Sequence, residues 1–185
     1  VKKAAAAAER IFHVIDNETV IKEEPNAINI NSFNDKIEIK NMSFSYDDEN
    51  VLNNFNLSIS KGKNIALVGQ SGSGKSTIAN LICRFYDVDS GSINIDGENI
   101  KKLKKESLRE LIGLVTQDSI LFNDSIKNNL LIAKPNATDD ELIDCLKIAN
   151  AWEFVNKLPD GINNNIGDSG NKLSGGQKQR LSIAR

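Results

Sequence analysis

Apolar and polar positions alternate in the segment that starts at Ile37, as expected for a strand with one buried face. The apolar positions are Ile37, Ile39, Met42 and Phe44. We therefore predict a region of antiparallel strands from Ile37 to about Ile59.

Two short apolar runs, over residues 65–68 and 112–116, predict further strands. The first run leads into a glycine-rich stretch and then into a helical pattern. The apolar side of that pattern carries Ile78, Leu81, Ile82 and Phe85. The glycine-rich stretch therefore lies at a predicted strand-to-helix turn.

The region from about residue 118 to 172 is predicted to be helical. One helix begins at Asp139, Asp140 and Glu141, because acidic residues are favourable at the positive end of a helix dipole. The apolar residues of this helix are Leu142, Ile143, Leu146 and Ile148, and the next helix carries Trp152, Phe154 and Val155. Strands followed by helices predict an α/β fold.

The N-terminal part, residues 1–35, differs from the rest in composition. Residues 1–15 are rich in alanine and predict a helix. Charged residues interrupt it, and nowhere does the sequence contain the run of about 18 apolar residues that a membrane span requires. Residues 16–35 are polar and asparagine-rich, which predicts a linker into a domain over 36–185.

The overall composition is that of a globular protein, with 39% hydrophobic residues and a formal net charge of −2 over 185 residues. This charge gives no basic footprint for nucleic acid, so we expect no nucleic-acid partner. Cys83 and Cys145 lie in apolar helical patterns without CxxC spacing, which predicts buried free thiols.

The glycine-rich stretch matches the phosphate-loop pattern GxxxxGK[ST]. Its residues are Gly69, Gln70, Ser71, Gly72, Ser73, Gly74, Lys75, Ser76 and Thr77. Glycines with positive φ at 69, 72 and 74 turn backbone N–H groups toward an anion, and the following helix adds its dipole. Lys75 then reaches the β- and γ-phosphates, and Ser76 is placed to ligate Mg²⁺. A loop that only turns the chain is the weaker reading.

A second motif lies about a hundred residues later and consists of Ser174, Gly175, Gly176 and Gln177. From the residues alone, Ser174 with Gln177 three positions on is a capping box at a helix N-terminus. The same helix start is able to hold an anion, with the Ser174 hydroxyl as donor and Gly176 allowing close backbone approach.

Together, these two motifs resemble those of the nucleotide-binding domain of ATP-binding cassette (ABC) transporters, over about residues 37–185. The resemblance implies a RecA-like core with the phosphate loop, an antiparallel β flank and a helical subdomain over about 118–172. It also implies ATP and Mg²⁺ as cofactors. In this family the phosphate loop of one subunit and the signature motif of the other enclose one ATP, so the expected partner is a second copy in a head-to-tail homodimer.

Two further residues match the family individually. Tyr46 occupies the place of the aromatic residue on which adenine stacks, although an aromatic at a strand end often only packs. Gln117 matches the Q-loop glutamine, which shares Mg²⁺ with Ser76 or orients the attacking water. The resemblance thus assigns Lys75 and Gln117 to catalysis and Ser76 and Gln117 to the metal.

Spacer motifs resemble exporters whose membrane and ATPase domains are fused, in particular bacterial half-transporters that flip lipid A and related lipids. These spacers are Arg84-Phe85-Tyr86-Asp87, the stretch over 91–97 and the stretch over 121–129. Asp168 and Ser169 occupy the place of an exporter loop that usually carries Glu-Arg. Ser169 therefore replaces the usual cation.

The family pattern continues beyond Arg185 with a Mg²⁺-ordering Asp, a general-base Glu and a switch His. We therefore expect the chain to be a fragment that lacks the C-terminal part of the domain and is inactive alone. Apolar surface and unpaired backbone should then remain beside the phosphate-loop strand.

The leading functional hypothesis is the ATPase domain of an ABC exporter on the cytoplasmic face of the bacterial inner membrane. ATP binding would close the dimer and hydrolysis would reopen it, which drives export or lipid flipping by fused transmembrane domains. The alternatives are a soluble ABC ATPase of DNA repair or translation and a nucleotide-binding module that does not hydrolyse ATP.

Overall fold

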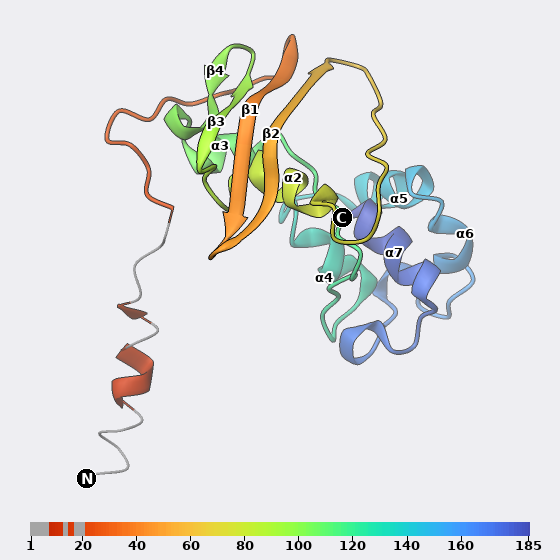
Figure 1. Ribbon diagram of the computed structural model, residues 1–185. Helices are drawn as coiled ribbons and strands as arrows, with labels where there is room; N and C mark the ends of the chain where they lie inside the picture. The colour runs from red at the N-terminus through yellow and green to blue at the C-terminus, as the bar shows by residue number, and fades with distance from the viewer. Residues whose placement is uncertain (1–7, 13–14, 17–20) are drawn as a thin grey trace. The chain divides into compact units, whose positions relative to one another are not determined.

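The structure is a computed structural model that describes residues 8–12, 15–16 and 21–185 (Figure 1). The chain divides into two compact units, Val1–Gly113 and Leu114–Arg185, and each has its own hydrophobic core. In the helix predicted over 1–15, residues 8–12 and 15 are helical, and the others lie outside the described residues. None of the helices in the described ranges is long and apolar enough to cross a lipid bilayer.

The first unit is built on a four-stranded antiparallel sheet with the order β2-β1-β3-β4 (Figure 1). The strands are β1 Lys36–Tyr46, β2 Glu49–Ser60, β3 Ser90–Ile95 and β4 Glu98–Asn99. In the β1–β2 hairpin, Ile37 lies opposite Ile59 and Tyr46 opposite Glu49. The prediction of antiparallel strands between Ile37 and Ile59 is therefore confirmed.

A bulge in β1 explains why its apolar positions change from odd to even numbers. The register with β2 shifts between Ile39 and Met42, and Asn41 has a φ of 46°. The extra residue keeps Met42 on the buried face, three positions after Ile39. Gly91 of β3 passes close to this bulge, and a Cβ on it would lie 2.3 Å from the Lys40 carbonyl oxygen. With a φ of 78° as well, this position requires glycine.

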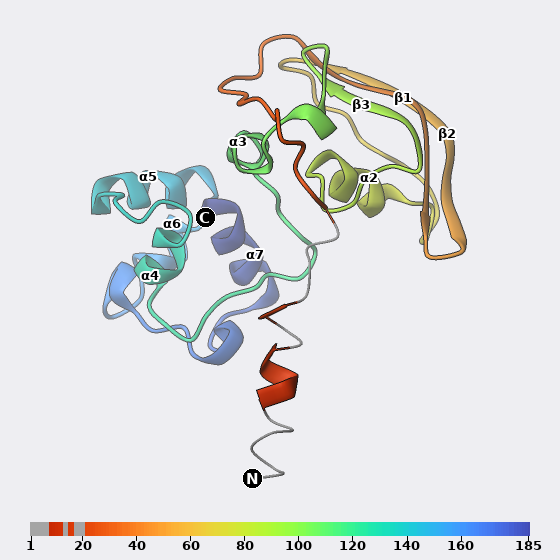
Figure 2. The same ribbon diagram turned by 90° about the vertical axis from the view of Figure 1, so that its left-hand side faces the viewer.

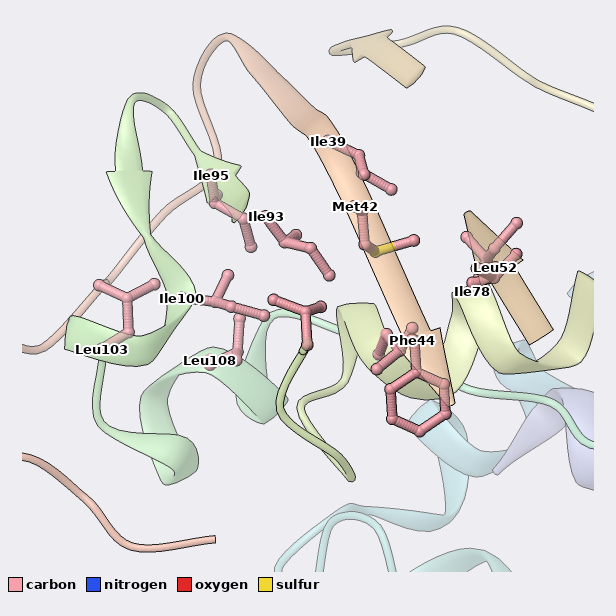
Figure 3. Packing of buried hydrophobic residues seen from close by; sticks show 12 residues of the cluster. Ile39, Met42, Phe44, Leu52, Ile78, Ile93, Ile95, Ile100, Leu103 and Leu108 are labelled. Carbon is pink, nitrogen blue, oxygen red and sulfur yellow. The ribbon is translucent and has the colours of Figure 1, made fainter. Parts of the chain in front are cut away.

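Helix α2 (Lys75–Ile82) packs on one face of the sheet, with η1 (Ile100–Lys102) and α3 (Lys105–Glu110) nearby (Figure 2). The core joins side chains from all these elements (Figure 3), including Ile39, Met42, Phe44, Leu52, Ile78, Ile93, Ile95, Ile100, Leu103 and Leu108. The helix ends before Phe85, which the sequence pattern placed on its apolar side. It ends there because Arg84 has a φ of 51°, outside the helical region.

The two apolar runs predicted as strands, 65–68 and 112–116, are not strands. Neither run is hydrogen-bonded into the sheet that the structure describes, and Val68 is 93% exposed. An apolar run becomes a buried strand only where neighbouring strands take up its backbone hydrogen bonds and both faces are covered. Within the described residues these runs have no such neighbours, so both strand predictions are wrong here.

The described part of the predicted linker, residues 21–35, is held against the first unit by hydrogen bonds. Ile28 forms a parallel bridge with Leu103. The Asp96 carboxylate accepts the backbone N–H groups of residues 34–36 at 2.6 to 3.0 Å. Burial raises the pKa of Asp96, but these N–H donors outweigh it and bring the pKa below its usual value.

The second unit is helical (Figure 1), with α4 Ile126–Leu131, α5 Asp139–Ile148, α6 Trp152–Val155, α7 Gly175–Ala184 and the short 3-10 helices η2 Gly161–Asn163 and η3 Asp168–Gly170. Helix α5 starts at Asp139 as predicted, after a capping box formed by Thr138 and Glu141. Its buried residues Leu142 and Leu146 belong to the core of this unit.

The two cysteines lie in different environments, although both are free. Cys83 is buried as predicted, and burial raises the pKa of its thiol. Cys145 is exposed, so the prediction that it is buried is wrong. It lies at the edge of the face that carries Leu142 and Leu146, three residues after Leu142, and there it lines an open pocket together with Leu142 and Ile148.

Candidate nucleotide site

The predicted phosphate loop, residues 69–77, leads directly into α2. Gly72 and Gly74 have φ values of 82° and 81°, as predicted. Gly69 is not among the residues with positive φ, so that part of the prediction is wrong. Gly69 instead permits a close approach, since a Cβ on it would lie 2.7 Å from Ser73 Oγ.

The side chain of Lys75 lies along the loop. Its Nζ donates hydrogen bonds to the carbonyl oxygens of Gly69 at 3.0 Å and Gln70 at 2.6 Å, and to Ser73 Oγ at 3.2 Å. All three acceptors are neutral. The positive charge of Lys75 therefore stays available to an anion held by the loop.

The first turn of α2 has the character of an anion site. Its N-cap is Gly74, which has no side chain to accept a hydrogen bond from the first backbone N–H groups. These groups and the helix dipole both favour a negative ligand. Ser76 is exposed in this turn and Thr77 is buried. The Ser76 hydroxyl is therefore the accessible oxygen donor of the two.

Tyr46, at the end of β1, belongs to a cluster of three aromatic rings. The Tyr46 ring lies edge-to-face with Phe44 at 4.8 Å and with Tyr86 at 5.1 Å between ring centroids. Such pairs stabilise by about 0.5–1.5 kcal/mol beyond the burial of their area. The cluster borders an open pocket of about 500 Å³ lined by Ile21, Phe44, Ser45, Tyr46, Asp47, Tyr86 and Asp87.

The hairpin that carries Tyr46 also contacts the phosphate loop. A Cβ on Gly74 would lie 2.8 Å from Leu52 Cδ2 and 3.2 Å from Val51 Cγ1. Leu52 lies opposite Phe44 in the β1–β2 register. The β1–β2 hairpin therefore contacts the phosphate loop and also lines the aromatic pocket. This arrangement suits a ligand with an aromatic ring at one end and phosphates at the other.

The second motif forms the N-terminus of α7 in the other unit. Ser174 is the N-cap, and its Oγ accepts the Gln177 backbone N–H at 3.3 Å. In return, Gln177 Oε1 accepts the Ser174 N–H at 2.8 Å. The capping box that the residues alone indicated is therefore present. Gly175 and Gly176 occupy the first two helical positions, with nothing within 4 Å of an added Cβ.

Gln117 lies in the same unit as the second motif. It lines an open hollow of about 330 Å³ together with Asp118, Ser119, Ser169, Gly175, Lys178 and Gln179. Ser169 has a φ of 49°. Because Ser76 belongs to the first unit, the predicted sharing of one Mg²⁺ by Ser76 and Gln117 stays a prediction.

Sequence reasoning did not assign Tyr86 to the pocket. It treated the stretch that contains Tyr86 only as a spacer, whereas the Tyr86 ring contacts both Tyr46 and Phe44. The sequence signal for an ordered turn around Tyr86 was Arg84, a charged residue placed directly after an apolar helical pattern. Arg84 is 2% exposed and its Nε donates to Asp87 at 3.1 Å.

Comparisons with known proteins address the family directly. Residues 52–185 match the family described as ABC transporter. Two proteins of Staphylococcus aureus, from strains NCTC 8325 / PS 47 and COL, are named as candidate multidrug export ATP-binding/permease proteins. Each is 51% identical over 177 residues, which cover 95% of this chain and 31% of the relative.

A solved structure of a bacterial Atm1-family ABC exporter with ATP bound is also similar. It has a TM-score of 0.91 and 38% sequence identity, over 99% of this chain and 32% of that chain. The chain thus spans about a third of the length of the proteins it matches. Since the family match extends over most of the sequence and includes both the phosphate loop and the Ser174 motif, the chain belongs to the ABC transporter family.

Proposed function

We propose that this chain belongs to the ATP-binding domain of an ABC exporter, and that the whole protein binds and hydrolyses ATP to drive export. The observation that carries this proposal is the phosphate loop. It presents an uncapped helix N-terminus and a lysine that donates to neutral acceptors, and the hairpin that contacts it at Gly74 also carries part of the aromatic pocket. The names of the relatives support an exporter.

In this proposal the triphosphate lies on residues 69–77 and adenine stacks on Tyr46. Lys75 stabilises the charge on the β- and γ-phosphates. Ser76 and Gln117 have hard oxygen donors of the kind that Mg²⁺ prefers, and when bound Mg²⁺ neutralises charge on the phosphates. Gln117 also orients the attacking water.

The motif at Ser174 is proposed to contact the ATP held by a second copy of the chain in a head-to-tail homodimer. The capping box does not prevent this. Ser174 Oγ uses one lone pair to accept the Gln177 N–H, so its own O–H can still donate to a γ-phosphate oxygen. The adjacent N–H groups of Gly175 and Gly176 strengthen the positive end of the helix.

The proposed further partner is a transmembrane domain fused to this domain in the whole protein, which would place the domain on the cytoplasmic face of the bacterial cell membrane. The ATP-binding/permease names of the relatives support this arrangement. The lipid substrate suggested by the spacer motifs stays a prediction, because substrates are selected in membrane helices and none of the described helices could span a bilayer.

The test of ATP hydrolysis uses the whole purified protein and the substitution Lys75→Ala. We expect turnover to fall by orders of magnitude, because a charge-assisted contact to the transferred phosphate is lost. Lys147→Ala is the matched control, since the exposed Lys147 side chain pairs with Asp144 on α5. Near-normal turnover of a folded Lys75→Ala protein would refute the assignment.

Membrane attachment separates the exporter from the soluble alternative. An exporter remains with the membrane fraction after a high-salt wash and needs detergent for release, whereas a DNA-repair or translation ATPase appears in the supernatant. Recovery of the whole protein in the supernatant would therefore favour the soluble class.

A further inference from the structure

The aromatic pocket beside Tyr46 has one wall from a distant part of the chain. Ile21 lines this pocket together with Tyr46 and Tyr86. It precedes the sheet and belongs to the segment that the sequence pattern predicted as a linker. A residue of that segment therefore helps to form a site whose other walls come from β1 and the stretch after α2.

Hydrogen bonds on both sides hold this segment in place. The Lys105 Nζ, at the start of α3, donates to the Ile21 carbonyl oxygen at 2.9 Å. The Lys105 backbone N–H donates to Glu23 Oε1 at 2.5 Å. Arg84 Nη2 donates to the Lys22 carbonyl oxygen at 3.2 Å. In Figure 2 the segment crosses in front of the first unit, and the hydrogen bonds place it against Lys105 at the start of α3 and Arg84 after α2.

Arg84 connects the segment to the pocket. Its guanidinium is buried and also donates to the carbonyl oxygens of Ile100 and Leu103, each at 3.3 Å. Its Nε donates to Asp87, which lines the pocket next to Tyr86. One side chain therefore fixes both the segment that carries Ile21 and the turn that carries Tyr86.

We infer that Ile21 and Tyr86 contact the base of the bound nucleotide together with Tyr46, and that Arg84 and Lys105 are positioning residues for this pocket. The inference rests on the proposed nucleotide site. Tyr86 supports the Tyr46 ring edge-to-face, and Ile21 covers apolar surface of the base. Because coupling between sites is reciprocal, base binding also strengthens the docking of residues 21–24.

The test compares two ligands of the whole protein, ATP and inorganic triphosphate, each titrated with Mg²⁺ in a calorimeter. Ile21→Ala and Tyr86→Leu should each weaken ATP by roughly three- to tenfold and leave the triphosphate affinity unchanged, because only ATP carries a base. Tyr46→Ala is the reference variant. It should weaken the affinity for ATP by roughly five- to 150-fold and leave the triphosphate affinity unchanged.

Two controls separate this inference from the proposed function. Ile28→Ala makes the same change in the same segment, but Ile28 is 48% exposed and outside the pocket, so it should alter neither affinity. Lys75→Ala should weaken both ligands. If Lys75→Ala changes neither affinity, the proposed phosphate site is wrong. If Ile21→Ala and Tyr86→Leu change neither affinity, or both equally, the base-pocket inference is wrong.

The positioning role has its own readout. Lys105→Met keeps the aliphatic stem but removes the bond to the Ile21 carbonyl oxygen, so it should weaken ATP as Ile21→Ala does. In the unchanged protein, ATP should slow backbone amide exchange within residues 21–24, and triphosphate should not. Equal protection by both ligands, or an unaltered ATP affinity in Lys105→Met, would overturn the role of this segment.

Discussion

Helices α2 and α7 both begin at a motif rich in glycine and serine, but their first turns are completed differently. Helix α2 begins at Gly74, which has a φ of 81° and offers no side chain as a cap. Helix α7 begins at Ser174, which has a φ of −68° and forms a reciprocal capping box with Gln177. The N-cap residue of α2 thus offers no side-chain acceptor to the first N–H groups, whereas the N-cap residue of α7 does.

This difference suits two different tasks. The first N–H groups of α2 need water or a ligand as acceptor, and the looped backbone before them is shaped for a phosphate. Helix α7 has its N-terminus fixed by the capping box without a ligand, so it can present a preformed surface to a nucleotide that is already bound elsewhere. The proposed division into an ATP-holding loop and a docking motif follows from this contrast.

Of the substitutions that test this comparison, Gly74→Ala at the N-cap of α2 is expected to have the largest effect on ATP affinity. The new Cβ would lie 2.8 Å from Leu52 Cδ2 and at a backbone conformation that alanine disfavours. Strain and overpacking together should weaken ATP binding on the order of a hundredfold, measured by titration of the whole protein.

Gly175→Ala in α7 is the matched control for backbone strain. Gly175 has no positive φ and no atom within 4 Å of an added Cβ, so its substitution should not lower the free energy of unfolding. Unimpaired ATP binding by Gly74→Ala would show that the geometry of the α2 N-cap does not matter.

Ser174→Arg should separate ATP binding from ATP-driven dimerisation. It leaves the phosphate loop intact, so the first ATP still binds, but it places bulk where the partner's γ-phosphate must dock. Dimerisation with ATP, measured by cross-linking or size-exclusion chromatography, should fail, and hydrolysis should fail with it.

A mixed dimer sharpens this result. When a Lys75→Ala chain pairs with a Ser174→Arg chain, one composite site carries both defects and the other is unaltered, so part of the hydrolysis should survive. A structure in which both motifs of one chain contact the same ATP would contradict the arrangement.

The capping boxes predict a smaller effect, on folding stability. Thr138→Ala in α5 and Ser174→Ala in α7 each remove an N-cap acceptor and should lower the free energy of unfolding by about 0.5–2 kcal/mol. Urea unfolding of the whole protein measures both. Unchanged stability in both variants would mean that these boxes do not contribute.

The smallest expected effect is a difference in pH dependence between the two boxes. The box of α5 uses Glu141, and the hydrogen bond from Lys134, followed by the N–H of Thr138, brings the pKa of Glu141 below its usual 4.5. Because the folded pKa is lowered, this stabilisation is present above pH 4.5 and is lost as the pH falls through the folded value. The box of α7 uses the neutral Gln177, so its contribution should not change over this range.

Backbone amide exchange in α5 and α7 between pH 5 and pH 3, corrected for intrinsic exchange rates, measures this difference. Glu141→Gln should remove the additional acid sensitivity of α5. Equal acid sensitivity of α5 and α7 would contradict the role of Glu141.

Local patterns predicted much of the fold because they depend on neighbours in sequence. The alternation from Ile37 predicted the β1–β2 hairpin, and the acidic run at Asp139 predicted the start of α5. The failures concern long-range partners. The run over 65–68 forms no strand, and Cys145 faces outward, since pairing and burial depend on elements far away in sequence.

For the candidate site, the sequence by itself predicted the phosphate loop and the Ser174 motif, because consecutive residues specify a loop or a helix start, and the family resemblance added Tyr46. Only the tertiary structure brought Ile21 and Tyr86 beside Tyr46, and Leu52 against Gly74. These contacts join residues 22 to 40 positions apart. They depend on the β1 bulge and on the buried Arg84, whose packing no local pattern specifies.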